Sequence, residues 1–284
     1  MIGGVDAHQH FWSLPRGDYG WLTPQSGSIY RDFGPRDLAP LLEDAGIART
    51  VLVQAAPTEA ETRYLLDIAA ATPYVAAVVG WVDLAARNAP DRLALLAGHA
   101  LLRGVRPMLQ DLPDPAWILA KALRPALKAL VDLGLCFDAL VKPLHLRPLR
   151  AFIDRNPDLP VVIDHAAKPA IRERSLGTWA RDIRDIARST PALCKLSGLV
   201  TEAKTDWRAA DLEYCILHLL DCFGPERLMW GSDWPVVELA GGYRRWHAAA
   251  HSFLAPLPAA DRERIFGENA ARFYGLDVAL RQAR

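Results

Sequence analysis

The sequence predicts an α/β fold, a (β/α)8 barrel of the TIM-barrel type. The chain has 284 residues, a length that suits one such barrel. Eight short apolar runs, rich in Val, Leu and Ile, have few alternating polar positions, as expected for parallel strands buried on both faces. The runs occupy residues 5–10, 50–55, 75–82, 104–109, 135–141, 161–165, 193–197 and 228–232.

The segments between these runs carry apolar residues at helical spacing and end at residues that stop helices. The clearest predicted helices are 35–45 before Gly46, 59–71 before Pro73, 115–133 before Gly134 and 211–223 before Gly224. No break in composition divides the chain, so we expect one barrel domain over residues 1–284. An open doubly wound sheet is the alternative, but residues 11–15 (FWSLP) replace the glycine-rich turn expected after its first strand.

Composition argues against several classes of protein. Lys plus Arg and Asp plus Glu both number 33, giving no net charge, so no nucleic-acid partner is expected. The longest stretch without a charge, residues 68–82, contains Pro73 and is too short to cross a membrane. The four cysteines form no C-x-x-C pair, and no signal peptide is visible. We expect a soluble, cytoplasmic protein with reduced cysteines, and the sequence does not indicate its oligomeric state.

Polar residues collect where the predicted strands end, which is the catalytic face of such barrels. Alone, each has a structural interpretation: Asp233 could cap a turn, His165 could be a core histidine and Arg106 could pair with a carboxylate. Their joint occurrence favours an active site. The strand-end residues are His8, His10, Gln54, Trp81 with Asp83, Arg106, Lys142, His165 after Asp164, Ser197 and Asp233.

Several motifs together resemble the amidohydrolase superfamily, and within it the branch of sugar-lactone and related lactone hydrolases. The most specific are H-x-H at residues 8–10, D-H-x-x-K-P at 164–169 and G-S-D-W-P at 231–235. Supporting matches are DYGWL at 18–22, GVR at 104–106, KLSG at 195–198 and FGENAARFY at 266–274.

The resemblance implies an amidohydrolase-type barrel and a hydrolase that opens a sugar lactone, such as L-fuconolactone or L-rhamnonolactone, to the sugar acid. Asp233 would activate the water, while His8, His10, His165 and Arg106 would hold the carbonyl oxygen. Arg106 stands where two-metal members carry a bridging lysine. We therefore expect either no required metal or a single divalent ion, zinc, bound by His8, His10, His165 and Asp233.

Other residues are predicted to wall the substrate pocket. Aromatic faces and fixed donors suit a sugar, although most of the nine tryptophans are expected in the core. The predicted wall residues are Trp12, Trp21, Gln54, Trp81, Lys142, His145 and Trp234. Two alternatives stay open: a metal-dependent decarboxylase or amide-cleaving enzyme of the same superfamily, and a barrel that only binds a small molecule. The second is disfavoured by the presence of Asp233 and all three histidines.

Overall fold

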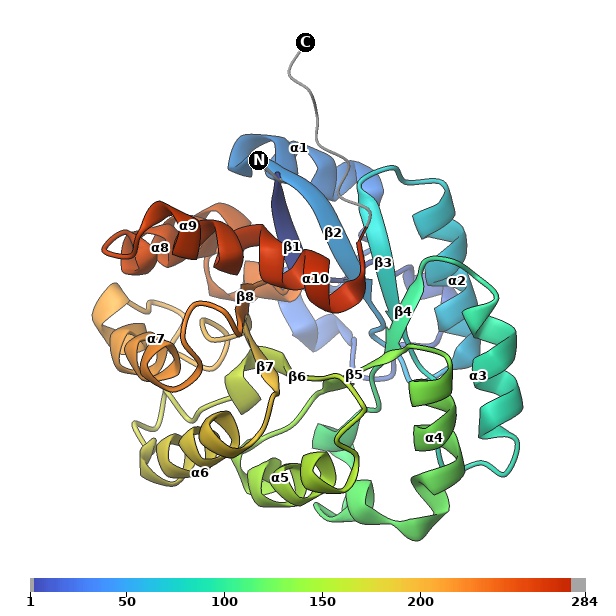
Figure 1. Ribbon diagram of the computed structural model, residues 1–284. Helices are drawn as coiled ribbons and strands as arrows, with labels where there is room; N and C mark the ends of the chain where they lie inside the picture. Colours follow the sequence, from blue (N-terminus) through green and yellow to red (C-terminus); the bar gives the residue numbers. More distant parts are fainter. Residues whose placement is uncertain (1–2, 277–284) are drawn as a thin grey trace.

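A computed structural model describes residues 3–276, and its strands form a parallel eight-stranded sheet in the order β1 to β8. Figure 1 shows these strands surrounded by helices. This confirms the predicted (β/α)8 barrel. The strands are β1 (Gly4–Gln9), β2 (Ile47–Val53), β3 (Val75–Gly80), β4 (Leu102–Val105), β5 (Cys136–Ala139), β6 (Val161–Ile163), β7 (Leu193–Leu196) and β8 (Leu228–Trp230).

The α-helices follow the strands along the chain. They are α1 (Pro35–Ala45), α2 (Glu59–Ala70), α3 (Ala89–Ala97), α4 (Arg124–Asp132), α5 (Leu146–Arg155), α6 (Gly177–Ser189), α7 (Ala209–Phe223), α8 (Tyr243–Leu254), α9 (Ala259–Glu263) and α10 (Asn269–Tyr274). No helix among residues 3–276 is long and apolar enough to cross a membrane.

The predicted helix over 115–133 is wrong in its first half. Two short 3-10 helices occupy Trp117–Leu119 and Lys121–Leu123, and the α-helix begins only at Arg124. Pro125 explains the late start, because proline has no N–H to donate and its ring clashes with a preceding helical turn. It is tolerated in the first turn of α4, where that N–H would have no helical partner.

Two apolar layers hold the barrel together. One large cluster fills the space between strands and helices and includes Leu52, Val78, Phe137 and Trp230. A smaller cluster joins residues of several strands to α10, whose Tyr274 is 2% exposed. The strands are therefore buried on both faces, as their near-continuous Val and Leu content requires.

The chain that follows β8 lies against β1 and completes the ring of strands. The Asp233 N–H donates to the His8 carbonyl at 2.8 Å, and the His10 N–H donates to the Trp234 carbonyl at 2.7 Å. The Asp6 carboxylate accepts from the Ser232 N–H at 2.8 Å and the His8 N–H at 3.1 Å. These bonds place residues from the two ends of the chain side by side.

Candidate active site

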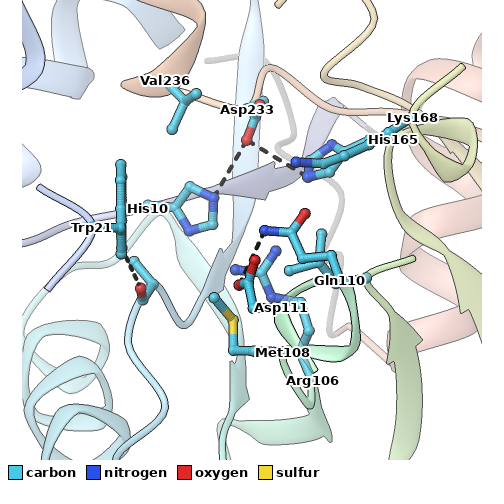
Figure 2. Close-up of a pocket in the computed structure, with 12 residues that line it drawn as sticks. His10, Trp21, Arg106, Met108, Gln110, Asp111, His165, Lys168, Asp233 and Val236 are labelled. Atoms are coloured by element: carbon cyan, nitrogen blue, oxygen red, sulfur yellow. Dashed lines mark hydrogen bonds and ion pairs between the residues drawn. The ribbon is translucent and has the colours of Figure 1, made fainter. Parts of the chain in front are cut away.

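A cavity of about 260 Å³ lies at the carboxyl ends of the strands. Four residues predicted for catalysis line it: His10, Arg106, His165 and Asp233. Figure 2 shows them around one space, with Asp233 on a loop and His10 beside it. His8 is fully buried behind this wall. The remaining lining residues are Trp21, Ala55, Met108, Gln110, Asp111, Leu140, Lys168 and Val236.

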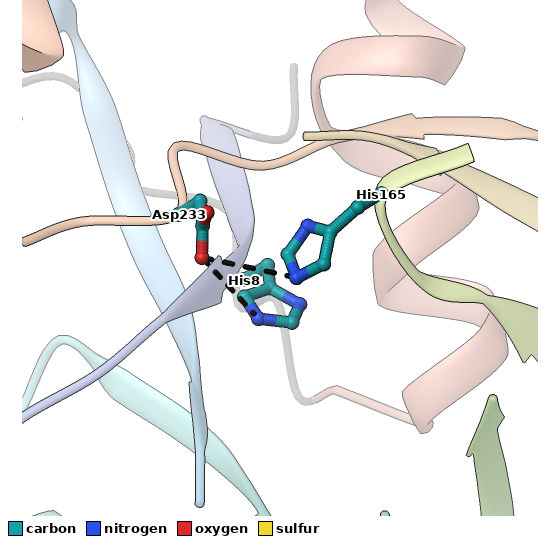
Figure 3. Close-up of side chains that lie close together, drawn as sticks. All are labelled: His8, His165 and Asp233. Carbon is teal, nitrogen blue, oxygen red and sulfur yellow. Dashed lines mark ion pairs between the residues drawn. The ribbon is translucent and has the colours of Figure 1, made fainter. Parts of the chain in front are cut away.

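The Asp233 carboxylate faces three imidazoles. Its Oδ1 lies 3.4 Å from His10 Nε2 and 3.8 Å from Nε2 of both His8 and His165, and Figure 3 shows it opposite His8 and His165. Burial alone would raise the pKa of Asp233, but the neighbouring His165, His10 and His8 together lower it below its ordinary value. Asp233 is therefore an ionised carboxylate at neutral pH, as a general base must be.

A backbone contact fixes the tautomer of His10. His10 Nδ1 lies 2.8 Å from the Val53 carbonyl oxygen, which can only accept a hydrogen bond. Nδ1 therefore carries the proton of the neutral His10 ring, and Nε2 is an acceptor. Burial lowers the pKa of His10 below its ordinary value, so the ring is neutral.

His165 stands on a strained backbone turn. Residues 165–168 have positive φ angles of 51°, 50°, 60° and 51°, a left-handed conformation that costs about 1–2 kcal/mol for each non-glycine residue. His165 Nδ1 contacts Ser197 Oγ at 2.9 Å. A Cβ at Gly198 would lie 2.6 Å from that nitrogen, so only glycine fits there. Burial lowers the pKa of His165 to about 4, and the turn thus presents a neutral imidazole to Asp233.

Arg106 is held rigidly at the end of β4. One of its terminal nitrogens donates to the Gln54 carbonyl, and the other lies 3.4 Å from Asp164 Oδ2. The Gln54 side chain donates back to the Arg106 carbonyl at 2.7 Å. Gln54 was predicted as a pocket wall, but the structure places it behind Arg106, where it orients the guanidinium.

The structure separates the predicted aromatic wall into two groups. Trp21 lines the cavity, with its indole N–H donating to the Ala55 carbonyl at 2.8 Å. Trp81 lines a neighbouring cavity of about 640 Å³ that also contacts Trp21. Trp12 and Trp234 do not line the cavity with Asp233, because both are buried against Phe33 in an aromatic cluster that supports the loops after β1 and β8.

Two further predicted wall residues lie outside the cavity. The Lys142 side chain is exposed to solvent. His145 is buried, and its Nδ1 accepts from the Lys142 backbone N–H at 3.0 Å, so it stabilises the turn after β5. β5 ends at Ala139, so residues 140 and 141 separate the strand from Lys142 and His145. Both residues therefore lie beyond the mouth of the barrel.

Several cavity residues were not predicted from the sequence. Met108, Gln110 and Asp111 belong to the loop after β4, and Lys168 ends the left-handed turn after β6. Lys168 is the lysine of the D-H-x-x-K-P motif, so the motif was a signal for it. The loop residues carry no such pattern, and only the folded loop brings them over Arg106.

The residue types in the site fit one divalent metal ion. Ligand atoms of His8, His165 and Asp233 all lie within 4.8 Å of one another. Imidazole nitrogens and a carboxylate are the ligands of catalytic zinc sites. His10 Nε2 lies 3.2 Å from His8 Nε2 and adds a fourth donor. The Arg106 guanidinium lies 3.3 Å from His8 Nε2, and its positive charge would repel a second metal ion.

The chain is similar to known proteins over nearly its whole length. The amidohydrolase family model matches residues 5–276. An L-fucono-1,5-lactonase from Burkholderia ambifaria is 48% identical, over 98% of this chain and 97% of that protein. A second L-fucono-1,5-lactonase, from Burkholderia multivorans, is 38% identical over 96% of each chain.

Solved structures show the same architecture. A zinc-bound crystal structure of an amidohydrolase from Burkholderia multivorans superposes with a TM-score of 0.91 at 38% identity, covering 96% of this chain and 99% of that one. A probable 2-pyrone-4,6-dicarboxylic acid hydrolase from Acinetobacter baumannii superposes with a TM-score of 0.81 at 17% identity, covering 97% and 100%. The second likeness concerns the fold alone.

Proposed function

The chain belongs to the amidohydrolase family, and we propose that it opens L-fucono-1,5-lactone to the sugar acid by attack of water activated by Asp233. The chain is a lactonase, a carboxylic ester hydrolase acting on a sugar lactone, because its relatives of that activity match over nearly their whole length. The single observation that carries the mechanism is the position of the Asp233 carboxylate on the cavity wall, 3.4–3.8 Å from three imidazoles.

Opening a lactone requires a base for water, donors for the developing oxyanion and an acid for the leaving alkoxide. Asp233 Oδ1 is an acceptor at the cavity wall, 3.4 Å from His10 Nε2. A water molecule that donates one hydrogen bond to Asp233 Oδ1 keeps an oxygen lone pair directed at the lactone carbonyl. Asp233 takes that proton as the C–O bond forms.

Arg106 is the proposed principal donor to the oxyanion. Its Nε–H is buried without a hydrogen-bond partner among residues 3–276, and the side chain lines the cavity. A buried donor of this kind lacks a partner until a ligand supplies one. Lys168, 3.9 Å from Glu202 Oε1, adds a second positive charge on the wall and suits a substrate hydroxyl or the product carboxylate.

The leaving group needs a proton, and Asp233 supplies it. After water attack, Asp233 holds the proton next to the carbon that has become tetrahedral. Transfer of this proton to the ring oxygen completes cleavage of the C–O bond and restores the carboxylate. One residue thus serves first as base and then as acid, and no other proton donor is needed.

A divalent ion has a place in this site. His8, His10, His165 and Asp233 would hold one zinc ion, and when bound it would polarise the lactone carbonyl. The zinc-bound relative supports a divalent metal here. A metal-dependent decarboxylase of the same superfamily is less well supported, because the relatives at 48% and 38% identity are lactonases.

Turnover of L-fucono-1,5-lactone tests the proposal. Each ring opening releases one proton, so a pH indicator in weak buffer follows the rate after the spontaneous rate is subtracted. We expect saturable turnover of this lactone and slower turnover of other six-carbon sugar lactones. Failure on every sugar lactone, together with release of carbon dioxide from an aromatic acid, would instead assign the site to decarboxylation.

A further inference from the structure

A fully buried lysine lies directly behind the proposed catalytic site. Lys195, on β7, has its Nζ 2.5 Å from Asp138 Oδ2 and 3.0 Å from Asp164 Oδ1. Its third neighbour is His8 Nδ1 at 3.2 Å. Burial would lower the pKa of Lys195, but the two carboxylates raise it above its ordinary value. An ammonium group has three donors and no acceptor, so Lys195 donates to Asp138 and to His8 and forms an ion pair with Asp164.

The contact with Lys195 determines which His8 nitrogen carries the proton. Because an ammonium can only donate, His8 Nδ1 must accept, and a neutral imidazole then carries its proton on Nε2. The contact with His10 leads to the same tautomer. His8 Nε2 and His10 Nε2 lie 3.2 Å apart, and His10 Nε2 is an acceptor, since Nδ1 donates to the Val53 carbonyl.

In the opposite tautomer, both His8 nitrogens would have unfavourable contacts, one of donor with donor and one of lone pair with lone pair. It would point a His8 Nδ1–H at the Lys195 ammonium and bring two lone pairs together between His8 and His10. Two longer contacts favour it: Asp164 Oδ1 is 3.4 Å from His8 Nδ1, and Arg106 is 3.3 Å from His8 Nε2. Asp164 and Arg106, however, already pair with each other at 3.4 Å, and Asp164 Oδ1 forms an ion pair with the Lys195 ammonium at 3.0 Å.

We propose that Lys195 is a positioning residue that locks His8 in the Nε2–H tautomer, so that His8 presents a donor rather than a lone pair to the catalytic centre. This inference rests on the proposed function for its role in turnover. His8 would then donate to Nε2 of His10, the imidazole that lies 3.4 Å from the Asp233 carboxylate, and keep that ring oriented beside the catalytic base. A divalent ion that uses His8 Nε2 must first displace its proton, which weakens metal binding by the unsubstituted protein.

Histidine-selective ¹⁵N NMR of the substrate-free protein tests the tautomer directly. Long-range ¹H–¹⁵N correlations distinguish a protonated Nε2 from a protonated Nδ1, and His8→Gln identifies the His8 signals by their loss. We expect Nε2–H for His8 in the parent protein. A parent protein with Nδ1–H on His8 overturns the proposal. Because no substrate is present, this result is independent of whether the protein opens a lactone.

The variant Lys195→Met removes the donor and keeps an unbranched apolar chain of similar length. We expect His8 to move to the Nδ1–H tautomer, with Asp164 as the new acceptor, and kcat to fall about tenfold to a hundredfold while KM changes less. If the folded variant keeps the parent tautomer, Lys195 does not set it and the proposal is wrong, whatever happens to kcat.

Because Lys195→Met also removes a positive charge, a second variant is needed. Lys195→Met with Asp138→Asn removes one positive and one negative charge. The introduced amide still offers the Tyr274 hydroxyl an acceptor in place of the Asp138 carboxylate oxygen, which lies 2.7 Å from it. Asp138→Asn alone is the matched control, and its His8 must stay in the Nε2–H tautomer. If Lys195→Met fails to fold by near-ultraviolet circular dichroism, the double variant and its control decide the question.

Zinc affinity is the second measurement. His247 and His251 on α8 have their Nε2 atoms 3.2 Å apart, an arrangement that can chelate zinc, so the titrations use a His247→Gln background. Without Lys195 to hold His8 in the Nε2–H tautomer, we expect zinc to bind Lys195→Met about tenfold more tightly than the parent at neutral pH. Equal or weaker binding by the folded variant would contradict the proposed lock.

Discussion

Replacing Asp233 with asparagine removes the proton acceptor and little else. Asp233 has a φ angle of 59°, a left-handed conformation that asparagine adopts more readily than most residues. Its contacts with Nε2 of His8, His10 and His165, at 3.4–3.8 Å, can be kept by an amide of the same shape. The variant therefore tests proton transfer with little change to the backbone.

The expected effect is a loss of at least about a hundredfold in kcat, since a positioned general base contributes about 10²–10⁴ to the rate. We expect no smaller loss in kcat, because Asp233 acts in both proton transfers of the proposed mechanism. KM should change far less, because Arg106 and Lys168, which would contact the substrate, are unaltered.

The assay is initial-rate kinetics on L-fucono-1,5-lactone with a pH indicator. Asp111→Asn is the matched control: Asp111 lines the same cavity but has no part in the histidine cluster, so we expect an effect below about tenfold. Near-normal turnover by folded Asp233→Asn would refute the assignment and leave Asp233 as a turn residue. Equal losses in both variants would mean that cavity charge, not base catalysis, is being measured.

Three further predictions concern metal, acid and stability. Dialysed protein with His247→Gln should bind at most one equivalent of divalent ion and keep at least part of its activity after chelation; two tightly bound zinc ions by elemental analysis would contradict this. The pKa of His165 is lowered to about 4 and that of Asp233 is also lowered, so kcat/KM should hold from neutral pH down to about pH 5 and fall near pH 4; an acid limb near the ordinary histidine value of about 6.5 would be inconsistent with buried, neutral His165. Burial raises the pKa of Glu61 from 4.5 to about 7, so its contribution to stability is present below pH 4.5 and is lost as the pH rises through 7. Glu61→Gln should therefore reduce the loss of unfolding free energy between pH 4.5 and pH 8 by up to ~3 kcal/mol, measured by urea denaturation; an unchanged pH dependence would show that Glu61 is not the group responsible.

The fold and the catalytic cluster could be predicted because both follow from local patterns and barrel topology. Buried parallel strands need continuous apolar runs, and strand ends in a barrel converge on one face. His8 and Asp233 are 225 positions apart in the sequence, yet the first and last strands of a closed barrel are neighbours. The backbone bond from Asp233 to the His8 carbonyl is a consequence of that closure.

The cavity wall could not be predicted in the same way, because it depends on how the loops fold. Trp12 and Trp234 are aromatic and close in sequence to catalytic residues, yet both pack inward on Phe33. Lys142 follows a strand but points to solvent. Lys168 reaches the cavity through four successive left-handed residues, a conformation that no spacing rule indicates.

Lys195 shows a different limit of sequence reasoning. It lies in the KLSG motif on an apolar strand, where a lone lysine has no visible partner. Its partners Asp138, Asp164 and His8 come from three other strands or their ends, and only the closed barrel brings them within hydrogen-bond distance.

The most direct test of the central claim compares kcat/KM for L-fucono-1,5-lactone and for unsubstituted butyrolactone. A site that binds substrate hydroxyls with fixed, buried donors rejects an analogue without them, because those donors are left unpaired. We predict a preference of about 10⁴ for the sugar lactone if two or more hydroxyl contacts are essential. Butyrolactone or an aromatic pyrone lactone as the better substrate would contradict the claim that this cavity recognises a sugar.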